Sequence, residues 1–459
     1  MGVSASGARA LNSFPFFKRA SMPCDLECKE IPMNFEMLHP ADRIVMLMDR
    51  IYYHNMTTAL GVNLSVRDAD GTVWISPGGV DKGNLRREDI MQIKADGSIV
   101  GIHRPSAEYP FHLAIYKKRP DIRAVLHAHP STLIAGSLHG LLPDVSILSG
   151  IEESMRNVSA VSYEIPGSSA LGDKISAEFS RGSDAVVLER HGVVIGASTV
   201  FGAFRFFENL YRCSQIQRNA KMIGGTVRRV CDEDIRRISE KTALGLREFP
   251  PAFRSSEELQ ARRELCDFIG RAYEKQFIMS GKGSFSCRLS DGSVLITPEW
   301  KDGQNPDVED FVLISDGKRE AGKIPCATLA RHLAIYANDP SVKSVIEATP
   351  PCSMAFAITE KTPDIRLLPE TYISLRNVRK YSLTSDDETI ARDVTAKNPV
   401  AIIENDCVLA VGTSLLRSFD KLEMMENSAK ILRDALVFGG TPTGISSEAF
   451  GELESAFNL

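Results

Sequence analysis

Two histidines separated by one residue, His127 and His129, stand at the end of a short apolar segment. Residues two apart on a strand point to the same face, so both imidazoles can reach one metal ion. The best third ligand is His191, which follows the apolar segment Ala185–Leu188 and precedes Gly192, where backbone can approach closely. Three neutral imidazoles with an open fourth position describe a catalytic zinc-type site. The His-x-His pattern alone is weak, because ordinary surface or core histidines also produce it.

The two halves of the chain repeat each other at an offset of about 220 residues. Residues 105–116 read PSAEYPFHLAIY, and residues 325–336 read PCATLARHLAIY. The chemically capable residues of the first half are replaced in the second: Glu108 by Thr328, His127 by Glu347, His129 by Thr349 and His191 by Asp406. Because all three proposed ligands change together, the repeat predicts a duplicated fold in which one copy keeps a metal site and the other, disarmed copy has lost its metal ligands.

Glu108 is the second candidate for chemistry. A carboxylate beside a metal ion can move protons during a reaction. The alternative is a solvated glutamate that the helix dipole favours in a first turn. Its replacement by Thr328 in the copy without the histidines favours the functional interpretation. His112, in contrast, persists as His332, so we assign it a packing or hydrogen-bonding role.

The elements that must position these residues alternate between helices and strands. Apolar periodicity and turn residues predict helices over residues 42–55, 107–118, 200–221 and 255–277, and strands over 63–67, 73–76, 122–127, 184–188, 284–288 and 294–298. The last helix begins with a capping-box pattern at residues 255–258. This alternation predicts an α/β fold in each half.

The length of 459 residues allows two or three domains, and the repeat favours two. We expect the following division: a disordered or targeting tail at 1–35, a domain with the metal site at 36–247, a linker at 248–256, a degenerate domain without the site at 257–445, and a C-terminal tail at 446–459.

Composition limits the class of protein. The net charge of −5 and the absence of a basic run argue against nucleic-acid binding. No apolar stretch reaches the roughly 18 residues of a transmembrane helix. The nine scattered cysteines fit free thiols in a reducing compartment, and a cytoplasmic location is the expectation. Cys24 and Cys28 form a close pair without nearby histidines, so we expect no zinc knuckle there.

The first 24 residues are basic and serine-rich, with no acidic residue before Asp25. This composition fits an organelle transit peptide. The start, MGVSAS, also fits the pattern for N-myristoylation. A plain disordered tail explains the segment equally well.

Three motifs together resemble the class II aldolase/adducin family: PSAEYPFH at 105–112, HAHP at 127–130 and LERHG at 188–192. The resemblance covers about residues 36–245 with motifs and about 257–445 as a degenerate repeat. It implies two tandem three-layer α/β/α domains. It also implies a homo-oligomer, since family members form four-fold assemblies with active sites between subunits. A covalent tandem could supply the neighbouring wall within one chain.

The resemblance also implies roles, residue by residue. His127, His129 and His191 match zinc ligands, Glu108 matches the acid/base, and Asn63, Gly79 and Ser106 match positions that line the substrate pocket. The chain departs from the family pattern at Val62, at Gly78 and at Ala107, which removes small or hydroxyl-bearing residues from the phosphate-binding loops. Phosphate sites depend on such donors, so a phosphorylated substrate is in doubt.

The implied activity is that of a metal-dependent lyase acting on a small molecule, as in carbohydrate metabolism. Aldol cleavage, epimerisation, dehydration and decarboxylation all pass through an enediolate-like anion that a metal ion stabilises. We rank retro-aldol cleavage of a small hydroxy-carbonyl or sugar-phosphate-like compound first. One divalent ion is expected, with zinc ahead of manganese, cobalt and iron.

The alternative function is that of an adducin-like, non-enzymatic protein that binds actin. The degenerate second half and the segment 208–217 resemble adducins. The complete set of metal residues and the lack of a long basic C-terminal tail favour the enzyme.

Overall fold

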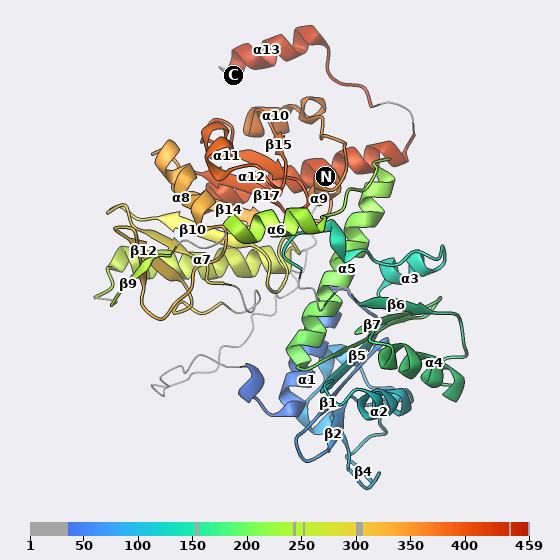
Figure 1. The fold of residues 1–459 in the computed structure, drawn as a ribbon. Coiled ribbons are helices and arrows are strands. Elements are labelled where there is room, and N and C mark those ends of the chain that lie inside the picture. The colour runs from blue at the N-terminus through green and yellow to red at the C-terminus, as the bar shows by residue number, and fades with distance from the viewer. Residues whose placement is uncertain are drawn as a thin grey trace, which may run out of the picture. The chain divides into compact units, whose positions relative to one another are not determined.

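The computed structural model describes residues 35–151, 155, 157–241, 245–250, 253–299, 306–439 and 442–457. Residues Asn34–Leu459 form one compact unit that contains two mixed sheets (Figure 1). We call residues 35–241 the first lobe and residues 245–457 the second lobe. The expectations for the first 24 residues and for Cys24 and Cys28 lie outside the described residues.

The sheet of the first lobe has the strand order β4-β3-β2-β1-β5-β8-β7-β6. Its strands are β1 (Val62–Arg67), β2 (Val73–Ile75), β3 (Met91–Ile93), β4 (Ile99–Val100), β5 (Ala124–Ala128), β6 (Val158–Val161), β7 (Ala185–Leu188) and β8 (Gly192–Ala197). β6 pairs with β7 in parallel, and the other described ladders of this sheet are antiparallel.

The sheet of the second lobe repeats this order strand for strand, as β13-β12-β11-β10-β14-β17-β16-β15. Its strands are β10 (Ser284–Arg288), β11 (Val294–Ile296), β12 (Val312–Ser315), β13 (Lys318–Glu320), β14 (Ser344–Ala348), β15 (Arg379–Tyr381), β16 (Val400–Ile403) and β17 (Cys407–Gly412). Among the described strands, the second sheet has one addition, β9 (Arg247–Phe249), which pairs with β13 in parallel. Part of the expected linker 248–256 therefore lies in the second sheet.

Helices cover both faces of each sheet. The first lobe contains α1 (Pro40–Tyr53), α2 (Tyr109–Lys118), α3 (Ser131–Ser137), α4 (Ser169–Ser180), α5 (Val200–Met222) and α6 (Asp232–Lys241). The second lobe contains α7 (Ser256–Glu274), α8 (Leu329–Asn338), α9 (Ser353–Ala357), α10 (Pro369–Leu375), α11 (Asp387–Asp393), α12 (Leu415–Val437) and α13 (Ser447–Phe457). The helix α13 occupies most of the expected C-terminal tail.

The apolar side chains pack into three clusters that define the layers. One cluster joins α2 and α4 to one face of the first sheet, and another joins α8 and α11 to one face of the second sheet. The largest cluster is shared, because α1 and α5 of the first lobe and α7 and α12 of the second contribute to it. The structure therefore has the two three-layer α/β/α domains that the sequence predicts, and their inner layers share one core.

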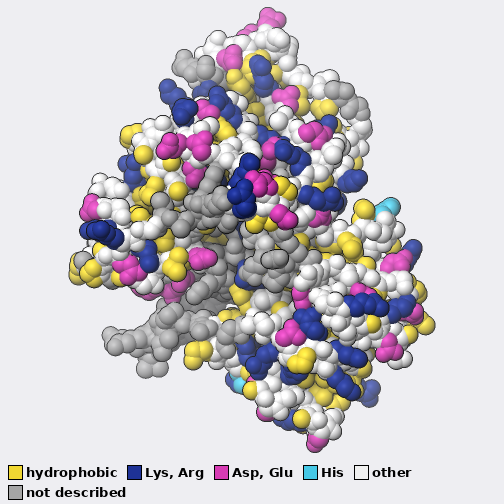
Figure 2. Space-filling view, viewed as in Figure 1, with side chains coloured by type: hydrophobic (Ala, Val, Ile, Leu, Met, Phe, Trp, Pro, Cys, Tyr) yellow, Lys and Arg dark blue, Asp and Glu magenta, His cyan; other side chains and the backbone are white. Residues whose placement is uncertain are grey.

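Local sequence explains where the helices nearest the site begin. Pro110 occupies the first turn of α2, where a missing N–H costs nothing, so the helix begins at Tyr109, slightly later than predicted. Ser255 caps α7, and its hydroxyl accepts a hydrogen bond from the Glu258 N–H. Among the described residues, no helix is both long enough and apolar enough to cross a membrane. On the face drawn in Figure 2, acidic and basic side chains are interspersed.

Candidate active site

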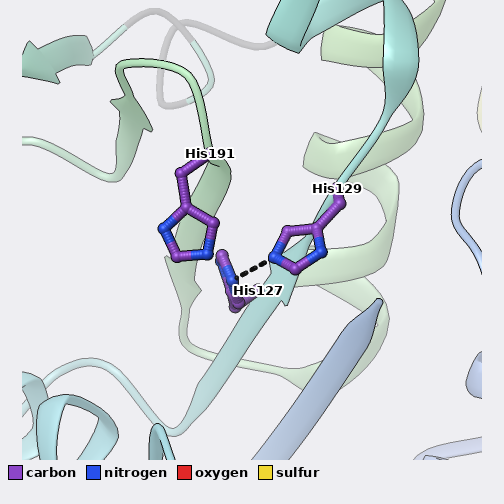
Figure 3. A group of neighbouring side chains, drawn as sticks. All are labelled: His127, His129 and His191. Atoms are coloured by element: carbon purple, nitrogen blue, oxygen red, sulfur yellow. Dashed lines mark hydrogen bonds between the residues drawn. The ribbon is translucent and has the colours of Figure 1, made fainter. Parts of the chain in front are cut away.

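The three histidines converge in the first lobe (Figure 3). His127 lies on β5, His129 follows that strand directly, and His191 lies in the turn between β7 and β8. One ligand nitrogen from each ring lies within 4.8 Å of the others. The ring centroids are 4.7, 5.0 and 4.9 Å apart. The structure thus brings together residues that are 64 positions apart in the chain (127 to 191).

The turn that carries His191 depends on its glycine. A Cβ atom at Gly192 would lie 2.4 Å from the Ala128 carbonyl oxygen and 2.8 Å from Cδ2 of His129. Arg190 in the same turn has a φ of 64°, so the chain reverses tightly between β7 and β8. The absence of a side chain at Gly192 lets this turn approach β5 and carry His191 to the other two rings.

The rings are prepared for a cation rather than for protons. The His127 Nδ1–H donates to the Val193 carbonyl at 3.0 Å, which leaves the lone pair of Nε2 directed at the other rings. Burial and the neighbouring histidines lower the pKa values of His127 and His129 to about 3, and burial lowers the pKa of His191. All three are therefore neutral near pH 7, which is the form that binds a metal ion.

The donor set fits a divalent metal ion. The Nε2 atoms of His127 and His129 are 2.9 Å apart, and the Nδ1 atom of His191 is buried without a hydrogen-bond partner among the described residues. Three neutral imidazole nitrogens at these separations suit Zn²⁺ and similar ions.

Glu108 lies against the same rings, at the N-terminal end of α2. Its Oε2 is 3.2 Å from Nε2 of His127, and its Oε1 is 3.6 Å from Nε2 of His191. The side chain is 15% exposed and makes no capping hydrogen bond, so it does not behave as a solvated first-turn glutamate. A carboxylate in this place can exchange protons with a molecule bound at the histidines.

A chain of hydrogen bonds links the Glu108 carboxylate to polar side chains of β1 and α2. The Asn63 amide donates to Glu108 Oε2 at 2.9 Å, and the Asn63 side-chain oxygen accepts from His112 Nε2 at 2.6 Å. The His112 Nδ1 atom then accepts from the Ser65 hydroxyl at 2.7 Å, and Ser65 accepts from the Tyr116 hydroxyl at 2.7 Å. An amide nitrogen can only donate, so the Asn63 oxygen must accept from the Nε2–H of His112. In the neutral ring the other nitrogen, Nδ1, then carries no hydrogen and must accept, which fixes the direction of each hydrogen bond in the chain.

This chain assigns His112 the hydrogen-bonding role that its persistence in both halves predicts. It also shows that Asn63, expected at the substrate pocket, is 5% exposed and uses both ends of its amide within the protein. Sequence reasoning missed the parts played by Ser65 and Tyr116. Their persistence as Ser286 and Tyr336 was the available signal.

The other two expected pocket residues lie beside Glu108. Ser106 is buried, and its Oγ accepts a hydrogen bond from the Glu108 N–H at 3.4 Å. A bridge between Pro77 and Pro105 brings the loop that contains Gly79 next to this segment, and a Cβ atom at Gly79 would meet only open space. Lys82 was not singled out from the sequence. It is 2% exposed, bonds to the Pro77 carbonyl, and burial lowers its pKa to about 8.

The equivalent place in the second lobe holds a cation from the chain itself. Ligand atoms of Glu347, Asp406 and Cys407 lie within 4.8 Å of one another. Arg331, which stands where the first lobe has Phe111, places its Nη1 atom 3.0 Å from Glu347 Oε1 and 3.4 Å from Asp406 Oδ2. Its guanidinium supplies positive charge to these carboxylates, as a metal ion would. Burial raises the pKa of Glu347 to about 6, against the opposing effect of Arg331.

Comparison with known proteins agrees with the geometry. The family model for the class II aldolase and adducin N-terminal domain matches residues 42–218 and residues 263–432. The chain belongs to this family. The double match reproduces the repeat read from the sequence and the two equivalent sheets.

Similar curated proteins of this family catalyse different reactions. The 5-deoxy-D-ribulose 1-phosphate aldolase of Bacillus thuringiensis serovar kurstaki is 35% identical over 188 residues, which are 40% of this chain and 86% of that protein. The 3-oxo-tetronate 4-phosphate decarboxylase of Haemophilus influenzae is 29% identical over 43% of this chain and 95% of its own. The methylthioribulose-1-phosphate dehydratase of Methylococcus capsulatus is 35% identical over 32% and 78%. These likenesses support an enzyme of the lyase type. Class II aldolases in general depend on a divalent metal ion.

Proposed function

We propose that the first lobe is a metal-dependent lyase that cleaves a small hydroxy-carbonyl substrate by a retro-aldol reaction. The observation that carries this proposal is the convergence of His127, His129 and His191 with the Glu108 carboxylate 3.2 Å from one of the rings. His127, His129 and His191 would hold one divalent ion, with zinc first. The ion would supply Lewis-acid stabilisation of negative charge on substrate oxygens.

The residues of the chain then perform the proton transfers. Glu108 takes the proton of the substrate hydroxyl whose carbon leaves as an aldehyde or ketone. The carbon–carbon bond breaks, and its electron pair moves to the carbon beside the carbonyl to give an enediolate. Glu108 returns the proton to that carbon, so atoms and charge balance. Asn63 and His112 keep the carboxylate in place during both transfers.

Epimerisation, dehydration and decarboxylation use the same anion and are the alternatives within this site. The relatives named above act on phosphorylated compounds, whereas this chain lacks donors that the family pattern places in the phosphate loops. The substrate panel must therefore contain phosphorylated and unphosphorylated sugars in matched pairs.

The test is a retro-aldol assay with metal-loaded full-length protein. We expect turnover with at least one compound, and a loss of about 10²- to 10⁴-fold in Glu108→Gln, which keeps the size of the side chain but cannot accept the proton. Thr328→Val, at the equivalent place in the second lobe, is the matched control and should leave turnover unchanged. Equal turnover by Glu108→Gln and wild type would remove Glu108 from this role.

The adducin-like alternative is tested by co-sedimentation with actin filaments. Robust binding that His127→Ala does not weaken, together with no turnover on the panel, would favour that function over the enzyme.

A further inference from the structure

A cavity of about 1030 Å³ opens to solvent in the first lobe, between α3 and the C-terminal half of α5 (Figure 1). Its lining includes Leu133 of α3 and the buried Pro143 and Val145 from the loop that follows that helix. None of its lining residues belongs to the candidate active site. A hollow of this size with an apolar floor can hold a small organic molecule.

The repeat shows that the scaffold does not require this cavity. Gly136 of α3 corresponds to Phe356 of α9, and Gln217 of α5 corresponds to Leu432 of α12. Gly136 and Gln217 line the cavity, whereas Phe356 and Leu432 are 4% and 8% exposed and belong to the shared apolar cluster. The second lobe thus carries buried apolar side chains at two positions that the first lobe leaves open.

Two positive charges on α5 face this cavity without acidic partners. Four charged residues line it, and two of these, Arg229 and Asp144, compensate each other in an ion pair at 2.5 Å. The other two are Arg218, whose Nη2 atom donates to the Asn219 side-chain oxygen at 3.2 Å, and Lys221. Neither of them makes an ion pair with a residue that the structure describes. A negatively charged group in the cavity would be attracted by both.

Apolar side chains form another part of the lining. Leu141 and Leu142 are 54% and 39% exposed, and Leu138 beside them is 51% exposed. Hydrophobic side chains are visible at the surface around α3 in Figure 2. Exposed apolar side chains that gather in one place mark binding surfaces more often than single ones do. The cavity therefore combines an apolar wall with uncompensated positive charge.

We propose that this cavity binds a small molecule with an apolar body and one phosphate or carboxylate group. The apolar body would lie against Leu133 and Val145, and the anionic group would lie beside Arg218 and Lys221. Apolar burial would supply most of the affinity, while the two half-solvated charges would select anions over neutral molecules of the same size.

The occupant would also touch the helix that connects two histidine-bearing segments. The helix α3 begins directly after His129 and Pro130. At its other end, the Ser137 Oγ accepts a hydrogen bond from the Arg190 N–H at 3.0 Å, in the turn that carries His191. The cavity lies on this same helix, so the proposed ligand would be bound next to the candidate metal site without contacting its ligands.

The probe for this cavity is 1-anilinonaphthalene-8-sulfonate, a dye with apolar rings and one anionic group, added to native full-length protein. We expect a saturable rise in fluorescence with about one dye per chain. Octyl phosphate and octanoate should displace the dye, and the stronger competitor identifies the preferred anion. Octan-1-ol and inorganic phosphate should each compete at least about tenfold more weakly, because each lacks one half of the proposed ligand. This measurement reads neither metal binding nor turnover, so it is independent of the proposed function.

Filling the cavity should remove the binding. Ala135→Trp adds bulk on the exposed part of α3 that lines the cavity, and Gly136→Phe introduces the residue of the second lobe. A Cβ atom at Gly136 would lie 3.3 Å from the Leu141 carbonyl oxygen, so Ala135→Trp is the milder change. Each should weaken dye binding at least about tenfold. Ala337→Trp, on an exposed position of α8, is the matched control and should leave binding unchanged.

Removing the positive charges should weaken the anion selectively. Lys221→Gln and Arg218→Gln should each reduce the affinity for octyl phosphate about 3-fold, and the double variant about tenfold, because solvent screens both charges. Lys430→Gln, at an exposed position of α12, should have no effect.

Three results would overturn the proposal. One is the absence of saturable dye binding, and another is displacement by octan-1-ol as strong as by octyl phosphate. The third is a signal per chain that falls as the protein concentration rises, since another copy of the chain would then cover the cavity.

Discussion

The two lobes share a scaffold down to individual hydrogen bonds and differ at its centre. In the first lobe, Tyr116, Ser65 and His112 form a buried series of hydrogen bonds. In the second lobe, the same three residue types, Tyr336, Ser286 and His332, form the same series. The lobes part at the next member, where Asn63 and Glu108 are replaced by Ser284 and Thr328, which bond to each other at 2.9 Å. We therefore expect the Tyr–Ser–His part of the series to support the fold in both lobes, and only Asn63 and Glu108 to serve the proposed reaction.

The centres also differ in where their positive charge comes from. Three neutral imidazoles in the first lobe form the site that we propose binds a divalent ion from solution. Two carboxylates in the second lobe need compensation, and the Arg331 guanidinium provides it permanently. A repeat can thus lose a metal site without leaving buried charges unpaired.

Metal content should show the largest difference between the lobes. Wild-type protein should bind about one divalent ion per chain, since among the described residues only the first lobe brings three neutral imidazole nitrogens together. His129→Ala should bind essentially none, whereas Glu347→Gln should still bind one. Elemental analysis after dialysis provides the measurement. Two ions per chain in the wild type would contradict the idea that the second copy is disarmed.

Removing the internal cation should cost more stability than any other change in the second lobe. Arg331→Met leaves the buried Glu347 without its partner and leaves Asp406 with Lys282 alone, so the free energy of unfolding should fall by about 3–5 kcal/mol. Urea denaturation of metal-free protein measures this loss. The double variant Arg331→Met, Glu347→Met should lose much less, because both charges of the pair leave together. Additive losses would show that the pair does not act as one unit.

Breaking the shared hydrogen-bond series at its serine should separate stability from activity. Ser65→Ala and Ser286→Ala each leave a buried ring nitrogen and a buried phenol unpaired, so each should lower the free energy of unfolding by about 1–3 kcal/mol. Only Ser65→Ala should also lower turnover, by about 10- to 100-fold, because His112 and Asn63 orient Glu108. If both variants lose turnover equally, the series has no specific link to Glu108.

The sequence was sufficient to predict the candidate site where the spacing of nearby residues reveals which side chains share a face. The spacing of His127 and His129, the apolar strand before His191 and the replacement of all three in the second half predicted one convergent cluster. Arg331 was not predictable, because its counterpart Phe111 is apolar and nothing in the order of residues places a guanidinium between Glu347 and Asp406. The burial of a single charged residue such as Lys82 also could not be predicted, because it produces no repeating pattern in the sequence. These features depend on contacts between distant segments.

The sequence also could not predict which lobe contacts which of the two sites. The tandem arrangement predicted that the second half could supply a wall to the working site, and the repeat is consistent with either direction of contact. The hydrogen bonds from Ser149 to Asp406 and from Asn405 to the Ile147 carbonyl show that the contact within the chain lies at the Glu347, Asp406 and Cys407 cluster.

The smallest predicted effect concerns acid. Burial opposes ionisation of Asp406, but the charges of Lys282 and Arg331 and the Ser149 hydroxyl lower its pKa to about 2. Since the folded-state pKa lies below the unfolded value, ionised Asp406 stabilises the fold above about pH 4, and this stabilisation is lost as the pH falls towards 2. Asp406→Asn removes the titration. The stability gap between wild type and Asp406→Asn, roughly 1–2 kcal/mol at neutral pH, should therefore narrow between pH 4 and pH 2.5 in urea titrations. A gap that stays constant over this range would mean that Asp406 ionises no more readily in the folded protein than in the unfolded chain. In that case Glu347 and Asp387 would be the carboxylates that compensate Arg331.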